Sequence, residues 1–595
     1  MLDALNAAQQ KAVIYTKGPS IILAGAGSGK TRVLTYKAAY LICEKHIAAP
    51  NILMVTFTNK AAHEMKERIL KLLSGQKNGE LPLAGTFHSL CAKMLRKHGK
   101  VIGISPSFVI YDDHDQKEAV KEIMKQLDIS QKHFHPSSVL ATISGAKNEL
   151  LTPSMYRGLA RGRFQETVTQ IYEEYAKLLK KNSALDFDDL LMETVRLLLE
   201  NDQVRAYYYD LFQFILVDEY QDTNHAQYTL TKLLTNQNRR ICVVGDASQS
   251  IYSWRGANYR NIMSFKSDFP ETKIFHLTKN YRSTQTILDA AYHIISKNTS
   301  HPILKLWTDK PKGKKIHLFS ARNEQEEARF ITFEIKRCHY GLHGTAVLYR
   351  TNAQSRVLEE ALLHEGIPYI LIGGTRFYER KEIKDILSYL RLIMNPADSI
   401  SRKRIDKIGK ERAQRFDVLS KTIDVTLPTA KILDRLLQTT KYLELYEKEI
   451  EEDYMRLENI KELRSVASEF PELTHFLENV ALVESEYFPD TDRSQPKDVV
   501  TLMTLHAAKG LEFRVVFMIG MEEGLFPHSR SLIDPHELEE ERRLCYVGIT
   551  RAKEHLYLTH AVKRLYFGIR TTNMVSRFLA DIPEPLLEAR EDMII

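Results

Sequence analysis

The feature that most constrains this chain is a glycine-rich segment near its N-terminus, Ala24-Gly25-Ala26-Gly27-Ser28-Gly29-Lys30-Thr31. The apolar run 20–24 predicts a buried strand, and the spacing of apolar residues after Lys30 predicts a helix. In a strand–turn–helix context, glycines let the backbone approach phosphates, and the amides at the helix start point toward them. The segment therefore predicts a nucleoside triphosphate site in an α/β fold.

Two side chains of this loop have separate roles in such a site. Lys30 would reach the β and γ phosphates, and the Thr31 hydroxyl would ligate Mg²⁺. Ala24 stands where the usual pattern has a glycine, and it is small enough to leave the prediction unchanged. The alternative is a glycine-rich turn without a ligand, which would leave the lysine and the threonine without a purpose.

A second apolar run, 212–217, ends in the acidic pair Asp218-Glu219. Carboxylates at the end of a parallel strand lie at the sheet edge where α/β folds bind ligands. Asp218 would hold the magnesium shell, and Glu219 would orient and deprotonate the attacking water. An isolated Asp-Glu pair is more often a solvated turn, but the phosphate loop upstream favours the catalytic interpretation.

Composition narrows the remaining function classes. The formal charge is only +7 over 595 residues, so a nucleic-acid contact would be a local basic groove rather than a polybasic tail. The five cysteines are scattered without a C-x-x-C pair, which argues against a zinc ribbon and indicates reduced thiols in a cytosolic protein. No stretch approaches 18 consecutive apolar residues, so no membrane span is expected.

Further motifs follow in a fixed order along nearly the whole chain. They are Leu5-Asn6-Ala7-Ala8-Gln9, Thr56-Phe57-Thr58-Asn59-Lys60, Gly85-Thr86-Phe87-His88-Ser89, Asp218-Glu219-Tyr220-Gln221-Asp222, Gly245-Asp246-Ala247-Ser248-Gln249, Asn280-Tyr281-Arg282-Ser283, Thr504-Leu505-His506-Ala507-Ala508 and Val547-Gly548-Ile549-Thr550-Arg551. In this order the set resembles the superfamily 1 DNA helicases of the UvrD, PcrA and Rep group, with the PcrA branch looking nearest. The resemblance implies ATP and Mg²⁺ as cofactors.

The resemblance also implies an α/β fold with two RecA-like parallel-sheet lobes, each interrupted by a mostly helical insertion. Apolar runs at 240–244, 316–319, 346–349, 515–519 and 556–558 supply further strands, and 324–337 and 356–365 supply helices between them. The expected domains are a first lobe (1–89 and 186–276), its insertion (90–185), a second lobe (277–395 and 498–583), a shortened insertion (396–497) and a short tail (584–595).

In the family pattern, four positions match residues around the adenosine. Gln9 resembles the glutamine that reads the adenine edge, and Tyr281 resembles the aromatic that stacks on adenine, with Arg32 nearby. Glu512 resembles a contact on the ribose side. The whole loop Ala24, Gly25, Ala26, Gly27, Ser28, Gly29, Lys30 and Thr31 would hold the phosphates.

Three further positions match residues that act at the γ-phosphate. Arg282 and Arg551 resemble the two arginines that the second lobe supplies to the γ-phosphate. Arginine suits this role because a guanidinium is always charged and fits phosphate oxygens. Gln249 resembles the residue that links the γ-phosphate to the DNA groove. The alternative for both arginines is a structural salt bridge.

Nucleic-acid contacts are implied at a set of aromatic and polar positions. Bases stack on aromatic side chains without sequence preference. The family track corresponds to Phe57, Phe187, Tyr252 and Trp254, with backbone or groove contacts at Thr86, His88, Arg255, His506 and His528, and a duplex wedge at Phe567. Phe187 could equally be a core residue.

The resemblance implies an ATP-dependent DNA helicase that moves 3′ to 5′ on single-stranded and forked DNA. The expected location is the cytoplasm, in association with the nucleoid. Repair or replication proteins are possible partners. Three other activities are alternatives: a single-strand translocase, an ATP switch that clamps nucleic acid without stepping, and a helicase–nuclease, for which the chain is expected to have no room. RNA is an alternative substrate. The short insertion leads us to expect reduced autoinhibition. With only a short tail expected after residue 583, tail-mediated recruitment of other proteins is not assumed.

Overall fold

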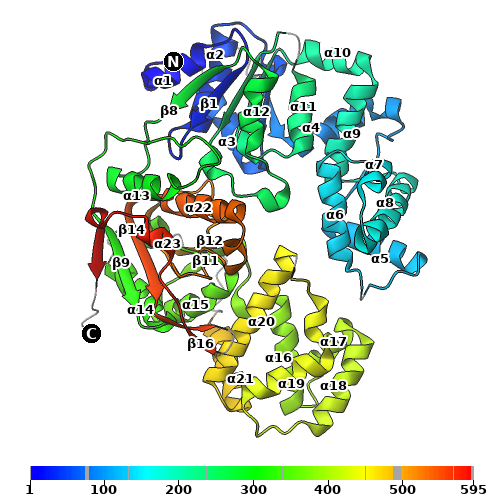
Figure 1. The fold of residues 1–595 in the computed structure, drawn as a ribbon, viewed down its shortest axis with the longest axis vertical. Coiled ribbons are helices and arrows are strands. Elements are labelled where there is room, and N and C mark those ends of the chain that lie inside the picture. Colours follow the sequence, from blue (N-terminus) through cyan, green and yellow to red (C-terminus); the bar gives the residue numbers. More distant parts are fainter. Residues whose placement is uncertain are drawn as a thin grey trace. The chain divides into compact units, whose positions relative to one another are not determined.

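The computed structural model describes residues 2–73, 80–131, 133–235, 238–337, 340–448, 450–486, 498–566 and 569–590. They divide into two compact units, one of residues 1–281 with 299–308 and one of residues 282–298 with 309–595. Each unit has its own parallel sheet and its own helical insertion, which confirms the predicted fold class (Figure 1).

The first unit is built on a six-stranded sheet in which every pair of neighbours is parallel. Its order is β3-β2-β6-β7-β1-β8. The strands are β1 (Ser20–Ala24), β2 (Ile52–Thr56), β3 (Leu83–Thr86), β6 (Phe214–Val217), β7 (Ile241–Gly245) and β8 (Lys273–Leu277). The predicted runs 20–24, 212–217 and 240–244 correspond to β1, β6 and β7, so the two nucleotide motifs lie on central strands.

Helices cover both faces of this sheet, because alternate residues of each strand face opposite sides. Ile22 of β1 packs on one face with α1 (Ala7–Ile14), α2 (Lys30–Cys43) and α3 (Asn59–Leu73). Ile21 packs on the other face, which is covered by α4 (Phe87–His98), α9 (Phe187–Glu200), α10 (Asp202–Leu211), α11 (His225–Leu234) and α12 (Arg260–Asp268).

The chain between α4 and α9 forms a helical insertion with a separate apolar core. It contains α5 (Asp113–Gln126), α6 (Pro136–Asn148), α7 (Pro153–Leu159) and α8 (Arg163–Lys181), with a parallel strand pair β4 (Val109–Tyr111) and β5 (Ala184–Asp186). These helices lie within residues 90–185, the range expected for the first insertion.

The second unit has a seven-stranded sheet of order β11-β12-β10-β13-β14-β9-β17, again with only parallel pairs. The strands are β9 (Ile316–Ala321), β10 (Thr345–Tyr349), β11 (Tyr369–Ile372), β12 (Val500–Thr504), β13 (Phe513–Met518), β14 (Ala552–Ala561) and β17 (Leu587–Arg590). Residues 587–590 were expected in a short tail, but that expectation is wrong, because β17 pairs with β9 as an edge strand.

The helices of the second unit include α14 (Glu324–Arg337) and α15 (Ser355–His364), which match the predicted helices and share an apolar core with the sheet. Two more, α13 (Gln285–Ile295) and α22 (Pro535–Ile549), pack against each other, and α22 also contacts β13 and β14. A short helix α23 (Arg577–Ala580) follows an antiparallel pair, β15 (Lys563–Tyr566) and β16 (Ile569–Thr572).

The expected second insertion is a helical bundle, drawn in yellow-green to yellow in Figure 1. It contains α17 (Ser399–Ile408), α18 (Lys410–Thr422), α19 (Thr429–Thr440), α20 (Glu451–Glu469) and α21 (Leu473–Glu486). Its core begins earlier than residue 396, because Phe377 and the whole apolar face of α16 (Lys381–Met394) belong to it. Among the described helices, none has the length and apolar character needed to cross a membrane.

Candidate nucleotide site and nucleic-acid interface

The glycine-rich loop joins the carboxyl end of β1 to the first residue of α2. Gly27 and Gly29 adopt left-handed backbone angles, with φ of 64° and 88°. A Cβ on Gly25 would come within 2.4 Å of the Leu306 side chain. Residues with side chains would therefore strain the loop at two positions and displace a core leucine at a third.

Protein donors occupy the carbonyl oxygens of this loop. The Gln9 side-chain amide donates to Ser28 O at 3.0 Å, Asn280 Nδ2 donates to Ala26 O at 2.7 Å, and Tyr281 N donates to Gly27 O at 3.0 Å. Among the described residues, the backbone amides of 26, 27 and 29 have no acceptor. Free amides in a tight loop before a helix form a site for an anion such as a phosphate.

Lys30 and Thr31 of the loop meet the acidic pair at the end of β6. Lys30 Nζ lies 3.3 Å from Glu219 Oε2, and Thr31 Oγ1 donates to Asp218 Oδ2 at 3.0 Å. The Lys30 ammonium is buried and makes no hydrogen bond of good geometry within the described part of the chain. A buried ammonium without hydrogen bonds is costly, and phosphate oxygens would satisfy it. The residues present thus fit a nucleotide phosphate with its metal ion.

Burial and, to a lesser extent, the neighbouring Glu219 carboxylate raise the pKa of the Asp218 carboxyl to about 7, although Lys30 opposes the shift. Asp246, at the end of β7, also has a raised pKa, chiefly because it is buried. A nearby cation would lower the pKa of these carboxyl groups, so their raised pKa values indicate that the cluster holds too little positive charge. A divalent cation at Asp218 would supply that charge.

Gln221 links Glu219 to the next strand. Its Nε2 donates to Glu219 Oε2 at 2.7 Å, and its Oε1 accepts from Asp246 N at 2.9 Å. Asp246 Oδ2 in turn accepts from Gln249 Nε2 at 2.6 Å. The four residues form a continuous hydrogen-bonded relay from the predicted water-activating glutamate to the predicted coupling glutamine.

The residues expected around the adenosine lie close to the loop in the first unit. Gln9 is fully buried, and its Oε1 accepts from Asn6 N. Tyr281 is half-exposed, and its hydroxyl accepts from Asn6 Nδ2 at 2.7 Å. Arg32 donates to Ala4 O. Tyr281 therefore offers an exposed ring face beside the loop, as stacking on a base requires.

Arg282, Arg551 and Glu512 lie in the second unit. Arg282 Nε donates to Glu512 Oε2 at 2.7 Å, and Lys553 pairs with the same carboxylate at 2.7 Å. Burial raises the pKa of Glu512, but Lys553 and Arg282 outweigh it, so the net pKa is lowered. The salt-bridge alternative thus describes Arg282 in this structure.

Arg551 is buried directly after α22. Its Nε donates to Val547 O at 2.9 Å, and its Nη1 donates to Leu511 O at 3.2 Å. These contacts hold the guanidinium in place against backbone carbonyls.

The aromatic positions expected to line a single-strand track gather on two segments of the first unit. Phe187, at the first turn of α9, is 44% exposed, which excludes the core alternative for it. The ring of His88 meets it edge-on, with centroids 5.8 Å apart. Trp254 is 49% exposed and lies 6.5 Å from the ring of Tyr252. Exposed aromatics at these positions suit base stacking.

Other expected contacts are less accessible. Phe57 packs edge-on against Phe87, with the ring centroids 5.8 Å apart, and Thr86 caps α4 by accepting from Ser89 N. His506 is partly buried in the second unit. The side chain of Arg255 and the whole of Phe567 lie outside the described residues.

His528 is only 4% exposed, which does not agree with a DNA contact at this position in this structure. Its ring meets Tyr454 of α20 edge-on, with centroids 5.5 Å apart. The burial follows from the packing of α20 on this loop, which the sequence around His528 does not reveal.

Comparison with known proteins agrees with this geometry. Residues 5–270 match the UvrD/REP helicase N-terminal domain, and residues 275–427 and 406–563 match the UvrD-like helicase C-terminal domain. The chain belongs to the UvrD-like helicase family. The family predicted from the ordered motifs is therefore confirmed.

Several relatives in this family align over almost the whole chain. The ATP-dependent DNA helicase PcrA of Staphylococcus aureus and that of Bacillus subtilis are each 45% identical over 644 residues, covering 99% of this chain and 87% of the relative. The PcrA of Staphylococcus epidermidis is 44% identical over 645 residues, with 99% and 88% covered. Because the alignments are longer than the 595 residues of this chain, the relatives carry extra residues within the aligned region.

Two buried contacts at the end of α6 were not predicted from the motifs. Lys147 Nζ lies 2.6 Å from both Asp186 Oδ2 and Asp189 Oδ1, on either side of Phe187. Asn148 Oδ1 accepts from Asn224 Nδ2 at 2.6 Å, at the end of the acidic motif. The sequence shows only a lysine and an asparagine side by side, and neither residue type identifies its partner.

Proposed function

We propose that this chain is an ATP-dependent DNA helicase that moves along single-stranded DNA, from 3′ to 5′, and unwinds duplex ahead of it. The proposal rests on one observation above all, the meeting of Lys30 and Thr31 with Asp218 and Glu219 at the end of β6. This arrangement lies in a chain that matches both helicase family models.

The residues of the first unit divide the work of ATP hydrolysis. The free amides of the loop and Lys30 bind phosphate oxygens, while Thr31 and Asp218 hold Mg²⁺. Glu219 accepts the proton of the attacking water, and Gln221 orients that carboxylate. Bound ATP supplies the phosphoanhydride whose cleavage drives movement. Gln9, Arg32 and Tyr281 select and hold the adenine, and Glu512 contacts the ribose.

The second unit contributes Arg282 and Arg551 to the γ-phosphate when ATP is bound. Arg282 must then exchange its bond to Glu512 for one to phosphate, which would couple nucleotide binding to a local rearrangement. We take residues 1–89 with 186–276 as the first lobe and 90–185 as its insertion. The second lobe comprises 277–376 with 498–590, because Phe377 and α16 belong to the core of the second insertion and β17 pairs with β9. Gln249 would relay the state of the phosphate to the aromatic track.

On the DNA side, Phe187, Tyr252 and Trp254 stack on bases, Phe57 supports them, and Thr86, His88, Arg255 and His506 contact the strand. Phe567 would act as the wedge. Forked DNA is the expected substrate, repair or replication proteins are possible partners, and the cytoplasm, with the nucleoid, is the expected location.

The decisive measurement is ATP turnover with and without single-stranded DNA, for the wild type and for Glu219→Gln. Strong stimulation by DNA that the substitution reduces by about 10²- to 10⁴-fold would support the motor. Turnover that ignores DNA would favour an ATP switch instead. Unwinding of a forked duplex then separates a helicase from a translocase, and parallel assays with RNA of the same sequence test the substrate class.

A further inference from the structure

Within the second unit, β15 and β16 form a two-stranded hairpin that is separate from the seven-stranded sheet. Its register pairs Lys563 with Thr572 and Tyr566 with Ile569. A two-stranded hairpin by itself is marginally stable in water, so its direction depends on the elements that hold it, and β15 contacts both α14 and α20. The hydrogen bonds and ion pairs described below lie at the root of the hairpin, around Arg564 and Asn573.

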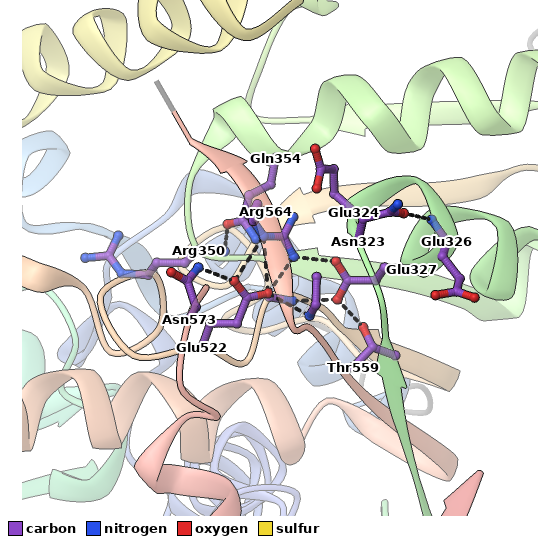
Figure 2. A network of polar contacts seen from close by, with 12 residues as sticks. Asn323, Glu324, Glu326, Glu327, Arg350, Gln354, Glu522, Thr559, Arg564 and Asn573 are labelled. Atoms are coloured by element: carbon purple, nitrogen blue, oxygen red, sulfur yellow. Dashed lines mark hydrogen bonds and ion pairs between the residues drawn. The ribbon is translucent and has the colours of Figure 1, made fainter. Parts of the chain in front are cut away.

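Arg564, the second residue of β15, sits between two buried glutamates (Figure 2). Its Nη2 donates to Glu327 Oε2 at 2.5 Å and to Glu522 Oε1 at 2.7 Å, and its Nε donates to Glu522 as well. Glu327 belongs to α14, and Glu522 follows β13. One planar guanidinium therefore joins the hairpin to two separate parts of the unit.

One carboxylate, that of Glu522, is bound both by β15 and by the residue after β16. Glu522 accepts from Asn573 Nδ2 at 2.7 Å, just after β16, and from Ala561 N at 2.9 Å, at the end of β14. Glu324, at the first turn of α14, accepts from Leu565 N. Figure 2 shows Glu327, Glu522 and Asn573 gathered around Arg564 from separate elements.

The charges of this cluster explain why arginine is needed at its centre. Two buried carboxylates face one guanidinium, and the excess negative charge is offset by hydrogen bonds, including those that Gly520 N and Thr559 Oγ1 donate to Glu327. Burial lowers the pKa of Arg564, but Glu522 and Glu327 raise it well above its usual value, so the guanidinium stays charged. A planar fork can bind two carboxylates in fixed directions, which a lysine ammonium cannot do.

We propose that Arg564 is a positioning residue for strand separation. Its guanidinium, held between Glu327 and Glu522, fixes the direction in which the β15–β16 hairpin leaves the sheet. The proposal rests on the helicase function proposed above, because it assigns to this hairpin the task of meeting the duplex. Arg564 touches neither nucleotide nor single strand in this role, and it acts only through the hairpin.

The test compares Arg564→Lys with wild type in three assays on the full chain. These are unwinding of a forked duplex, translocation along a single strand and DNA-stimulated ATP turnover. Unwinding should fall roughly tenfold or more, since a small misplacement of a working group is costly, while the other two rates stay within about twofold. Asn573→Ala, which removes one tie to Glu522, should shift the same ratio in the same direction by less.

Matched controls separate positioning from loss of structure. Arg322→Lys changes an arginine whose ion pair with Glu326 lies next to the network but is exposed, and it should unwind like wild type. If Arg564→Lys lowers ATP turnover and unwinding together, the residue is only structural and the proposal fails. If Asn573→Ala and Arg564→Lys both unwind normally, the proposal also fails.

Phe567→Ala distinguishes that failure from failure of the proposed function. A defective Phe567→Ala beside a normal Arg564→Lys keeps the wedge and overturns the positioning role. Normal unwinding by both variants overturns the wedge as well. Selective loss of unwinding in both variants supports the two assignments together.

Discussion

Gln221 donates its side-chain amide to Glu219 at 2.7 Å, while its own oxygen accepts from the backbone of Asp246 at 2.9 Å. One side chain thus fixes the proposed water-activating carboxylate against the neighbouring strand. Glu219 needs such support because its backbone adopts a left-handed angle, with φ of 50°, which costs a residue other than glycine about 1–3 kcal/mol.

Gln221→Met should therefore reduce ATP turnover in the presence of DNA by about tenfold, because Glu219 loses its orientation. Methionine has a similar volume but can make neither hydrogen bond. Steady-state turnover at saturating ATP is the measurement. Gln213→Met, the same change at a partly buried position just before β6, is the control and should remain close to wild type. Equal losses in the two variants would contradict the orienting role.

Trp254→Ala should weaken binding of single-stranded DNA by about 1–3 kcal/mol, because one stacking platform is lost. ATP turnover without DNA should not change. Titration of a labelled oligonucleotide, followed by fluorescence anisotropy, gives the dissociation constant. Trp307→Ala removes the other tryptophan of the chain, which is also exposed, and should leave DNA binding unaltered. Comparable weakening in both variants would show that Trp254 has no special place on the strand.

His528 should make the second unit less stable in acid. Burial and, to a lesser extent, the neighbouring Arg350 guanidinium together lower its pKa to about 4. Because the folded pKa is depressed below the unfolded value of about 6.5, protons favour the unfolded chain, and stability falls as the pH drops from about 6.5 toward 4. At pH 5.5 the loss should be about 1.4 kcal/mol relative to pH 7.5.

Urea unfolding at these two pH values measures the effect. His528→Gln should remove this part of the pH dependence, and His364→Gln, at an exposed histidine, should keep it. A wild type and a His528→Gln variant with the same acid sensitivity would show that the ring is protonated as easily in the folded state as in the unfolded one.

Local sequence was sufficient for much of the fold. Runs such as 21–24 and 241–244 are apolar throughout because the central strands are buried on both faces. Edge strands give no such signal. β8 is mostly half-exposed, and β17 reads Leu-Glu-Ala-Arg, so neither was predicted.

The residues of the candidate site likewise include some that local sequence identifies and some that it does not. The phosphate loop and the acidic pair are each continuous in sequence, so spacing alone identified Lys30, Thr31, Asp218 and Glu219. The pairing of Asn148 with Asn224 joins residues 76 positions apart, and the burial of His528 depends on α20. No local pattern encodes such contacts, because they arise only when distant elements pack.

Lys147 neutralises two buried carboxylates near the proposed DNA track, and replacing it tests how much this charge pairing stabilises the first unit. Lys147→Met would leave Asp186 and Asp189 buried without their cation, and losing one member of a buried pair costs about 3–5 kcal/mol. Burial already raises the pKa of Asp189 to about 7 although Lys147 opposes the shift, so without the lysine the carboxyl groups should take up protons more readily.

The destabilisation of the Lys147→Met variant should accordingly be larger at pH 8 than at pH 6, since protonation at the lower pH removes the unpaired charge. Urea unfolding of the first unit measures it at both values. The double variant with Asp189→Asn should recover part of the loss, because one buried charge is gone. Lys177→Met, at an exposed lysine paired with Glu174, should cost less than about 0.5 kcal/mol. A pH-independent loss without rescue would mean that Lys147 stabilises the insertion by packing alone.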